Sequence, residues 1–244
     1  MKICIAQSSS VAGEITQNIE NHLRLIDTAI QFQTDLIVFP ELSITGYEPS
    51  LAHELACHLY DNRFEEFQQR ADTHQIIVSI GVPTRSSEGI NISMILFQHN
   101  QERSVYSKHL LHVDELPYFV SGKDQSFLLK AEKRIAVGIC YETLKREHFI
   151  QAKEHGAEFY IASVAKPDRG TSKAYPHFSD MAEEFDIPIL MANCVGFCDN
   201  FLSNGKSAVW NRNGKMIAQL DETNQGLIVY DTTHDQAHAL IVDN

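Results

Sequence analysis

The sequence predicts one α/β domain in which a mixed sheet is layered with helices, and three observations support this fold class. Strand-like and helix-like segments alternate along all 244 residues. Runs such as 36–39 (Leu-Ile-Val-Phe) and 76–78 (Ile-Ile-Val) are continuously apolar, as expected of strands covered on both faces. The turn 211–214 (Asn-Arg-Asn-Gly) separates two strand-like segments, and Asn-Gly favours the tight turn of an antiparallel hairpin.

The predicted strands are rich in Val, Ile and Phe and are bounded by Gly, Pro, Asn or Asp. In chain order they are residues 2–7, 35–39, 75–82, 91–98, 102–107, 133–140, 157–163, 187–193, 206–211, 215–219 and 226–231.

Four predicted helices alternate with these strands, at residues 14–33, 62–74, 144–155 and 173–185. In the first helix, apolar residues spaced by three or four form one stripe, namely Ile15, Ile19, Leu23, Ile26 and Ile30. We find no Pro/Ser-rich linker, charge block or fixed-period repeat, so residues 1–231 are expected to form a single domain. Residues 232–244 are expected to form a C-terminal tail, either a weakly structured extension or an arm.

Composition argues against several classes of partner. The chain carries 32 acidic and 20 basic side chains, a net charge of −12, whereas nucleic-acid binding and attachment to anionic membranes depend on clustered Lys and Arg. No apolar run approaches the roughly 20 residues of a membrane span. Residues 1–7 are expected to form the first strand rather than a signal peptide, and the protein is expected to be cytoplasmic.

Neither a disulfide framework nor a metal site is indicated. The five cysteines are thinly spread without a Cys-x-x-Cys pair, and Cys194 and Cys198 are interpreted as incidental. The twelve histidines include no His-Glu-x-x-His pattern. No metal and no cofactor are therefore expected.

Cys140 stands where a buried strand ends and polar, helix-like sequence begins. The apolar run 135–139 leads into it, and 142–147 follows as the start of a helix. The amino end of a helix presents free N–H groups and a positive dipole, which favour a thiolate over a thiol. Cys140 could therefore be a nucleophile, although a single cysteine in this position is more often a small apolar residue in a sheet.

Three further polar side chains follow other predicted strands, near the edge where ligands bind in layered α/β proteins. Glu41 comes directly after 36–40, and this partly apolar setting raises the pKa of a carboxyl toward the range useful for acid–base catalysis. Lys108 closes the strand 102–107, and an ammonium there could stabilise an oxyanion. Asp114 and Glu115 could hold that lysine in place. Each of these residues alone could also be an ordinary loop or surface residue.

Taken in order, these segments resemble the carbon–nitrogen hydrolases of the nitrilase superfamily, and among them the amidase-like branch, over nearly the full length of the chain. The matching stretches are 35–42 (DLIVFPEL) with Thr45-Gly46-Tyr47, then 106–108 (YSK), Glu115 with Tyr118-Phe119 and Gly122, 138–142 (GICYE), Met181-Ala182-Glu183 with Pro188, 193–196 (NCVG), Gly205-Lys206-Ser207 and 213–215 (NGK). Two segments depart from the family pattern, namely 143–146 after the cysteine and the loop 163–169.

The resemblance implies an α-β-β-α sandwich with mixed sheets, of the kind that forms four layers, usually paired into homodimers or higher homo-oligomers. It also implies cysteine acylation without a metal or cofactor. In this mechanism Cys140 is the nucleophile and Glu41 the base and acid. Lys108 and the backbone N–H of Tyr141 hold the oxyanion, and Glu115 orients Lys108 and the substrate.

The expected substrate is a small amide, an ω-amide or similar, hydrolysed with release of ammonia or an amine. The expected pocket rim comprises Tyr47, Tyr118, Phe119, Val164 and Ala165, with Asn193 and Phe197 as further candidates. Lys166 and Arg169 could pair with a substrate carboxylate.

Four alternatives stay open at this point. The chain could act on N-carbamoyl compounds or, as a nitrilase, on nitriles. It could be a catalytically silent member of the fold that binds a small molecule or a partner protein. It could also be a Cys-His-Asp hydrolase, for which His177 is the best candidate histidine.

Overall fold

The computed structural model describes residues 1–123, 128–130 and 133–242, and two large mixed sheets organise them. The seven-stranded sheet has the order β15 (Gln236–Ile241), β14 (Gly226–Asp231), β1 (Lys2–Gln7), β2 (Leu36–Val38), β3 (Ile77–Arg85), β4 (Ile90–Phe97) and β5 (Ser104–Ser107). The six-stranded sheet has the order β13 (Met216–Gln219), β12 (Ala208–Trp210), β9 (Ile189–Asn193), β8 (Phe159–Val164), β7 (Arg134–Ile139) and β6 (Leu128–Lys130). A two-stranded sheet joins β10 (Val195–Cys198) to β11 (Phe201–Asn204).

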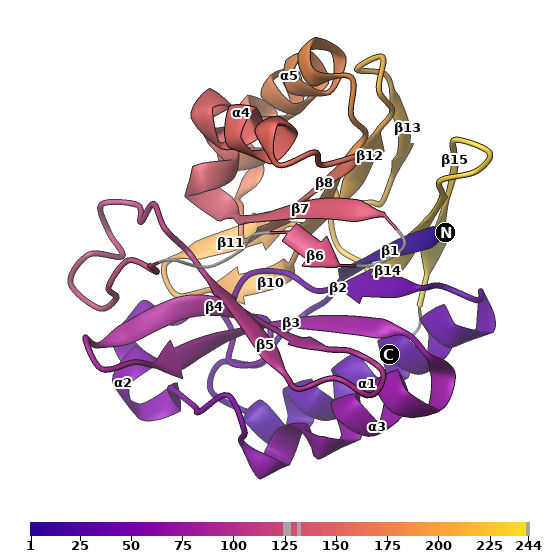
Figure 1. Cartoon of the computed structure of the whole chain (residues 1–244). Helices are drawn as coiled ribbons and strands as arrows, with labels where there is room; N and C mark the ends of the chain where they lie inside the picture. Colours follow the sequence, from indigo (N-terminus) through magenta and orange to yellow (C-terminus); the bar gives the residue numbers. More distant parts are fainter. Residues whose placement is uncertain (124–127, 131–132, 243–244) are drawn as a thin grey trace.

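Helices cover the outer faces of both large sheets (Figure 1). The helices α1 (Ile15–Gln31) and α3 (Glu65–His74) lie on the seven-stranded sheet, and α4 (Arg146–Glu154) and α5 (Asp168–Phe185) lie on the six-stranded sheet. Shorter helical pieces are η1 (Pro49–Leu51), α2 (Ala52–Leu55), η2 (Asn62–Phe64) and η3 (Cys140–Leu144). The layers therefore follow the order α-β-β-α, which confirms the predicted fold class.

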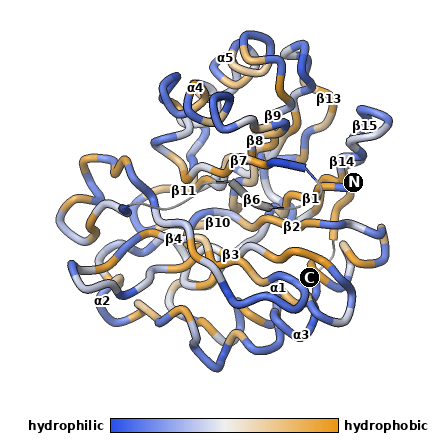
Figure 2. Tube along the Cα trace, in the orientation of Figure 1, coloured by the Kyte–Doolittle hydropathy of each residue, from blue (hydrophilic) through white to orange (hydrophobic). Residues whose placement is uncertain are grey.

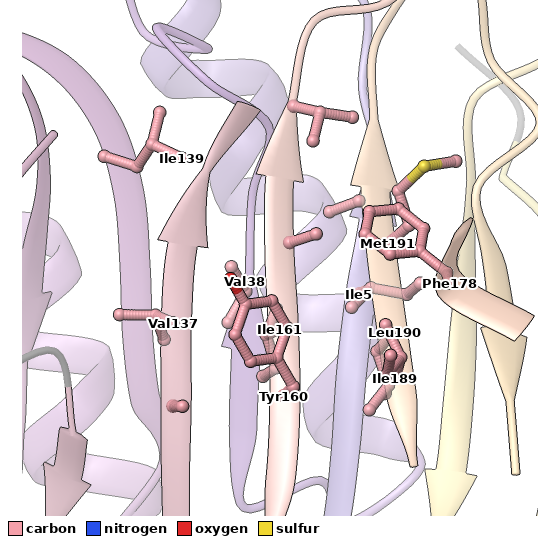
Figure 3. Packing of buried hydrophobic residues seen from close by; sticks show 14 of the residues in the cluster. Ile5, Val38, Val137, Ile139, Tyr160, Ile161, Phe178, Ile189, Leu190 and Met191 are labelled. Atoms are coloured by element: carbon pink, nitrogen blue, oxygen red, sulfur yellow. The ribbon is translucent and has the colours of Figure 1, made fainter. Parts of the chain in front are cut away.

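Alternating side chains on the strands build two cores. In β1, Ile3 and Ile5 belong to the core between the sheets, whereas Cys4 and Ala6 pack under α1 and α3, because successive side chains on a strand point to opposite faces. Figure 3 shows Ile5 of one sheet near strands of the other, within the same buried cluster. Along the chain, hydrophobic segments follow the strands of both sheets, and hydrophilic segments gather on helices and loops (Figure 2).

Parallel pairing brings the carboxyl ends of several strands from both sheets to one edge of the sandwich. β1, β2 and β3 are parallel neighbours, as are β7, β8 and β9. At this edge the Ser163 hydroxyl, on β8, donates a 2.8 Å hydrogen bond to the carbonyl of Phe39, which follows β2 in the other sheet. The segments that follow β2, β5, β7 and β8 therefore converge.

The expectation of a weakly structured tail was wrong for Gln236–Ile241, which forms β15 and pairs antiparallel with β14. This strand lies at an edge and most of its side chains are exposed, so backbone hydrogen bonds rather than an apolar pattern define it. The short strands β6, β10 and β11 were also not predicted. The assignment of residues 1–231 to a single domain stays a prediction.

Candidate active site

Cys140 lies on a tight bend between β7 and the 3-10 helix η3. β7 ends at Ile139, and Cys140 has a positive φ of 47°, which is an uncommon and strained conformation for a residue other than glycine. Gly138, two residues earlier on β7, leaves room for the Tyr160 hydroxyl, because a Cβ there would lie 2.5 Å from it. Tyr141 is the second residue of η3, where a backbone N–H has no partner within the helix. The predicted junction of strand end and helix start is confirmed.

Glu41 lies in a second tight turn, directly after β2. Leu42 has a φ of 52°, and the turn packs against Gly81 of β3. A Cβ at Gly81 would lie 2.3 Å from the carbonyl oxygen of Pro40 and 2.6 Å from the amide of Leu42. Only glycine therefore allows the backbone around Glu41 to approach the sheet this closely.

Lys108 joins Glu41 to Glu115. Its Nζ lies 2.7 Å from Glu41 Oε1 and 2.6 Å from Glu115 Oε1, and all three side chains are almost fully buried. The Tyr47 hydroxyl donates a 3.0 Å hydrogen bond to Glu115 Oε1, and the His112 amide donates one of 2.7 Å to Oε2. Glu115 is thus held from several sides, and it in turn fixes the position of the ammonium.

The electrostatics of this network suit a proton acceptor at neutral pH. Burial raises the pKa of Glu41 to about 7, although Lys108 opposes the shift. Burial alone would lower the pKa of Lys108, but Glu41 and the other anionic neighbours outweigh it, so the pKa lies above its ordinary value and the side chain is an ammonium. Glu41 Oε2 is buried and accepts no hydrogen bond from the residues that the structure describes. It is the free acceptor of the site.

The Cys140 sulfur rests as a thiol. Burial and the negative charge of Glu41 raise its pKa to about 11, whereas Lys166 and then Lys108 act in the opposite direction. Any reaction of this sulfur as a nucleophile at neutral pH therefore requires removal of its proton. Glu41 is the buried carboxylate whose charge acts most strongly on this thiol, and its Oε2 has room to accept a proton.

Glu142 braces the two segments that carry Cys140 and Lys108. Its buried carboxylate accepts hydrogen bonds from the Ile139 amide at 2.8 Å, the Tyr106 hydroxyl at 2.5 Å and the His109 amide at 2.9 Å. These donors flank the nucleophile and the lysine in sequence. Glu142 was not predicted as a site residue, although it stands directly after Cys140-Tyr141 in the sequence.

A cavity of about 540 Å³ opens at Cys140. Of the predicted site residues, it is lined by Tyr47, Glu115, Cys140, Tyr141, Ala165, Lys166 and Arg169. Asp114, suggested above as a partner of Lys108, also lines the cavity but pairs with His112 instead. Seven lining residues were not predicted, namely His112, Leu144, Pro167, Gly170, Lys173, Asn200 and Phe201. Phe201 lies on β11, which was not predicted as a strand, and its ring lies 5.7 Å from that of Tyr47.

Several predicted rim residues lie elsewhere. Val164 and Phe119 are buried in the core, and Tyr118 is 44% exposed; none of them lines this cavity. Phe197 is 82% exposed on β10. Asn193 is fully buried and holds the backbone of Lys166 through its side-chain amide.

Two other groups considered from the sequence lie apart from this chemistry. The His177 ring nitrogen lies 3.1 Å from the carbonyl of Thr143, and no described hydrogen bond joins it to Cys140. Cys194 and Cys198 are buried with their sulfurs 3.6 Å apart.

The part of the chain that the structure describes holds neither a candidate metal cluster nor a membrane-spanning helix. Across residues 1–123, 128–130 and 133–242, no three His, Cys, Asp or Glu side chains gather in a way that could hold a metal ion. Within the same ranges, no helix combines the length and hydropathy needed to cross a bilayer.

Solved structures of an amidase from Nesterenkonia sp. AN1 share this fold. One of them, with acrylamide added at the active-site cysteine, superposes with a TM-score of 0.87 over 96% of this chain and 94% of that one, at 22% sequence identity. Another, in complex with butyramide, gives a TM-score of 0.86 over 96% and 92% at 22% identity.

Curated proteins with similar sequences include longer NAD(+) synthetases and a protein named as a probable nitrilase. The chain is 23% identical over 228 residues to a glutamine-dependent NAD(+) synthetase of Aquifex aeolicus. This alignment covers 90% of this chain and 40% of that protein. It is 26% identical over 220 residues to a protein named probable nitrilase in Schizosaccharomyces pombe, covering 85% and 78%. The chain thus spans less than half the length of the synthetases that it matches.

The carbon-nitrogen hydrolase family profile matches residues 2–241, nearly the whole chain. The resemblance to carbon–nitrogen hydrolases inferred from the strand-end residues is thereby confirmed, and the chain belongs to the carbon-nitrogen hydrolase family.

Proposed function

We propose that this protein hydrolyses the C–N bond of a small amide, an ω-amide that carries a carboxylate, and releases ammonia. The observation that supports this most is the buried network of Glu41, Lys108 and Glu115 next to Cys140 at the base of the cavity. It combines a base, a cation and a nucleophile in one water-poor site.

In the first half-reaction, Glu41 takes the proton of the Cys140 thiol as the sulfur bonds to the amide carbon. The carbonyl electron pair moves onto oxygen, where Lys108 and the backbone N–H of Tyr141 stabilise the charge. The C–N bond then breaks, and Glu41 gives its proton to the departing nitrogen. Ammonia leaves, and the acyl group stays on Cys140 as a thioester.

In the second half-reaction, Glu41 takes a proton from water as the oxygen attacks the thioester carbon. The C–S bond breaks, the acid leaves, and the sulfur regains its proton from Glu41. One carboxyl thus acts as base and acid in turn, which suits a pKa of about 7. Glu115 keeps Lys108 in position throughout.

Arg169 supports a carboxylate on the substrate. It lines the cavity in the first turn of α5, where the helix dipole adds positive charge, and it forms no ion pair with the described residues. Several curated relatives are named glutamine-dependent NAD(+) synthetases, and glutamine is an ω-amide with a carboxylate. The butyramide bound by the amidase neighbour lacks a carboxylate, so neutral aliphatic amides are the main rival substrates.

N-carbamoyl compounds and nitriles stay alternative substrates, and a catalytically silent binding role stays the alternative of another class. The homodimer and the cytoplasmic location stay predictions.

Ammonia release over a panel of substrates tests the proposed function. The panel contains ω-amides with a carboxylate, N-carbamoyl compounds, short neutral amides and nitriles. We expect the highest kcat/KM on a carboxylated ω-amide, and a loss of at least about 1,000-fold in Cys140→Ala, because the nucleophile is gone. No turnover of any compound by the wild type would favour the silent-binder alternative.

Arg169→Ala tests the substrate carboxylate. Loss of a charge-assisted hydrogen bond is expected to lower kcat/KM for the carboxylated amide about 10- to 100-fold and to leave neutral amides nearly unchanged. Arg169→Lys should fall between the wild type and the alanine variant. An unchanged ratio of the two rates in Arg169→Ala would contradict this role.

The pH profile tests the role of Glu41. Because the base must be deprotonated and its pKa is raised to about 7, kcat/KM should rise with pH up to about 7 and fall roughly tenfold per unit below it. The rates are measured from pH 5 to 9 at constant ionic strength. Glu184→Gln, which removes a surface carboxylate paired with Arg146, is the control and should keep this profile. A flat wild-type profile down to pH 5 would rule out a base of this kind.

A further inference from the structure

Lys166 places a second ammonium at the nucleophile. Its side chain is only 5% exposed, and its Nζ lies 3.7 Å from the Cys140 sulfur. Among residues 1–123 and 133–242, no carboxylate lies within ion-pair distance of this ammonium. A buried ammonium without a carboxylate is costly, so its retention at a reactive sulfur points to a use.

The backbone of Lys166 is firmly held, which fixes the direction of the side chain. Its amide donates to Asn193 Oδ1 at 2.8 Å, and its carbonyl accepts from Asn193 Nδ2 at 3.1 Å and from the Ser203 hydroxyl at 2.9 Å. Gly170 leaves room for the stem, because a Cβ there would lie 3.1 Å from Lys166 Cβ. The two strands β9 and β11 thus support this one residue.

Lys108 alone is poorly placed to stabilise a negative charge on the sulfur. Its ammonium already binds two carboxylates, at 2.7 and 2.6 Å. Four buried charged groups act on the Cys140 sulfur and form one cluster, namely the carboxylates of Glu41 and Glu115 and the ammonium groups of Lys108 and Lys166. Two negative and two positive charges sum to zero. Transfer of the thiol proton to Glu41 keeps that sum, and without Lys166 the buried cluster would carry a net negative charge.

We propose that Lys166 is a catalytic residue of the site, whose ammonium stabilises the negative charge on the Cys140 sulfur as Glu41 removes its proton. In this step the S–H bond breaks, the proton moves to a Glu41 oxygen, and the electron pair stays on sulfur beside the Lys166 ammonium until the S–C bond forms. The same contact stabilises the sulfur when the thioester breaks. This inference rests on the nucleophile assignment of the proposed function and assigns Lys166 to the sulfur instead of a substrate carboxylate.

Alkylation of Cys140 by iodoacetamide tests the proposal without any substrate. The reagent is neutral, so its rate reports the reactivity of the sulfur and not the binding of a carboxylate. The groups that face the sulfur are Glu41 after β2, Lys108 and Glu115 after β5 and Lys166 after β8, with Tyr47, His112, Asp114, Tyr141, Arg169 and Lys173 around the cavity. Rates are measured by intact mass from pH 6 to 9.

Lys166→Met keeps the length of the side chain and removes its charge. A rise of one unit in the thiol pKa lowers the thiolate fraction about tenfold and raises its nucleophilicity about threefold, so alkylation slows about threefold per unit. We expect Lys166→Met to be alkylated at least about threefold more slowly than the wild type at every pH. The alkylation rate of Lys166→Arg should lie within about twofold of the wild-type rate. Lys133→Met, which removes an exposed lysine at the opposite end of β7, should react like the wild type.

The alkylation rates distinguish a role of Lys166 at the sulfur from a role in binding a substrate carboxylate. Equal alkylation rates in Lys166→Met and the wild type overturn the proposal, and selective loss of turnover on carboxylated amides would then make Lys166 a carboxylate ligand. Slowed alkylation supports it even if the wild type hydrolyses no amide, in which case only the proposed function fails. Thermal unfolding checks that the variants are folded, and Lys166→Gln replaces Lys166→Met if the latter is not.

Discussion

The buried ammonium of Lys108, clamped between two carboxylates, is the interaction on which the site depends. Glu41 comes from the end of β2, Lys108 from the end of β5, and Glu115 from the loop that follows. Removal of Lys108 would leave two buried carboxylates without their cation, and breaking a buried ion pair in this way costs about 3–5 kcal/mol. The network therefore locks three separate segments into one arrangement, and at the same time it sets the acid–base properties of Glu41.

The rest of the sandwich holds this network close to Cys140. Cys140 belongs to the six-stranded sheet and Lys108 follows the seven-stranded sheet, so the site exists only where the two sheets face each other. Glu142 ties the two sides together, because its carboxylate accepts hydrogen bonds from both segments. The strained backbone of Cys140 is the local cost of this geometry, and the packed core beneath it maintains the strain.

The sequence predicted most of the fold, because buried strands carry continuous apolar runs and helices carry stripes. It also predicted that Cys140, Glu41 and Lys108 stand at strand ends near one edge of the sheets, since each follows a recognisable strand. It failed for β15, whose exposed side chains have no apolar pattern, and for rim residues such as Tyr118. Which side chain points into a cavity depends on loop geometry, and spacing along the chain does not encode it. For the same reason the contact of Lys166 with the sulfur appeared only in the structure.

The central claim is that the reaction passes through a covalent bond to Cys140. Rapid acid quenching of the wild-type protein during turnover of an amide, followed by intact mass and peptide mapping, tests it most directly. We expect an added mass equal to the substrate less ammonia, located on the peptide that contains Cys140 and absent from the free protein. Steady turnover with no such adduct, or an adduct on another residue, would contradict the account.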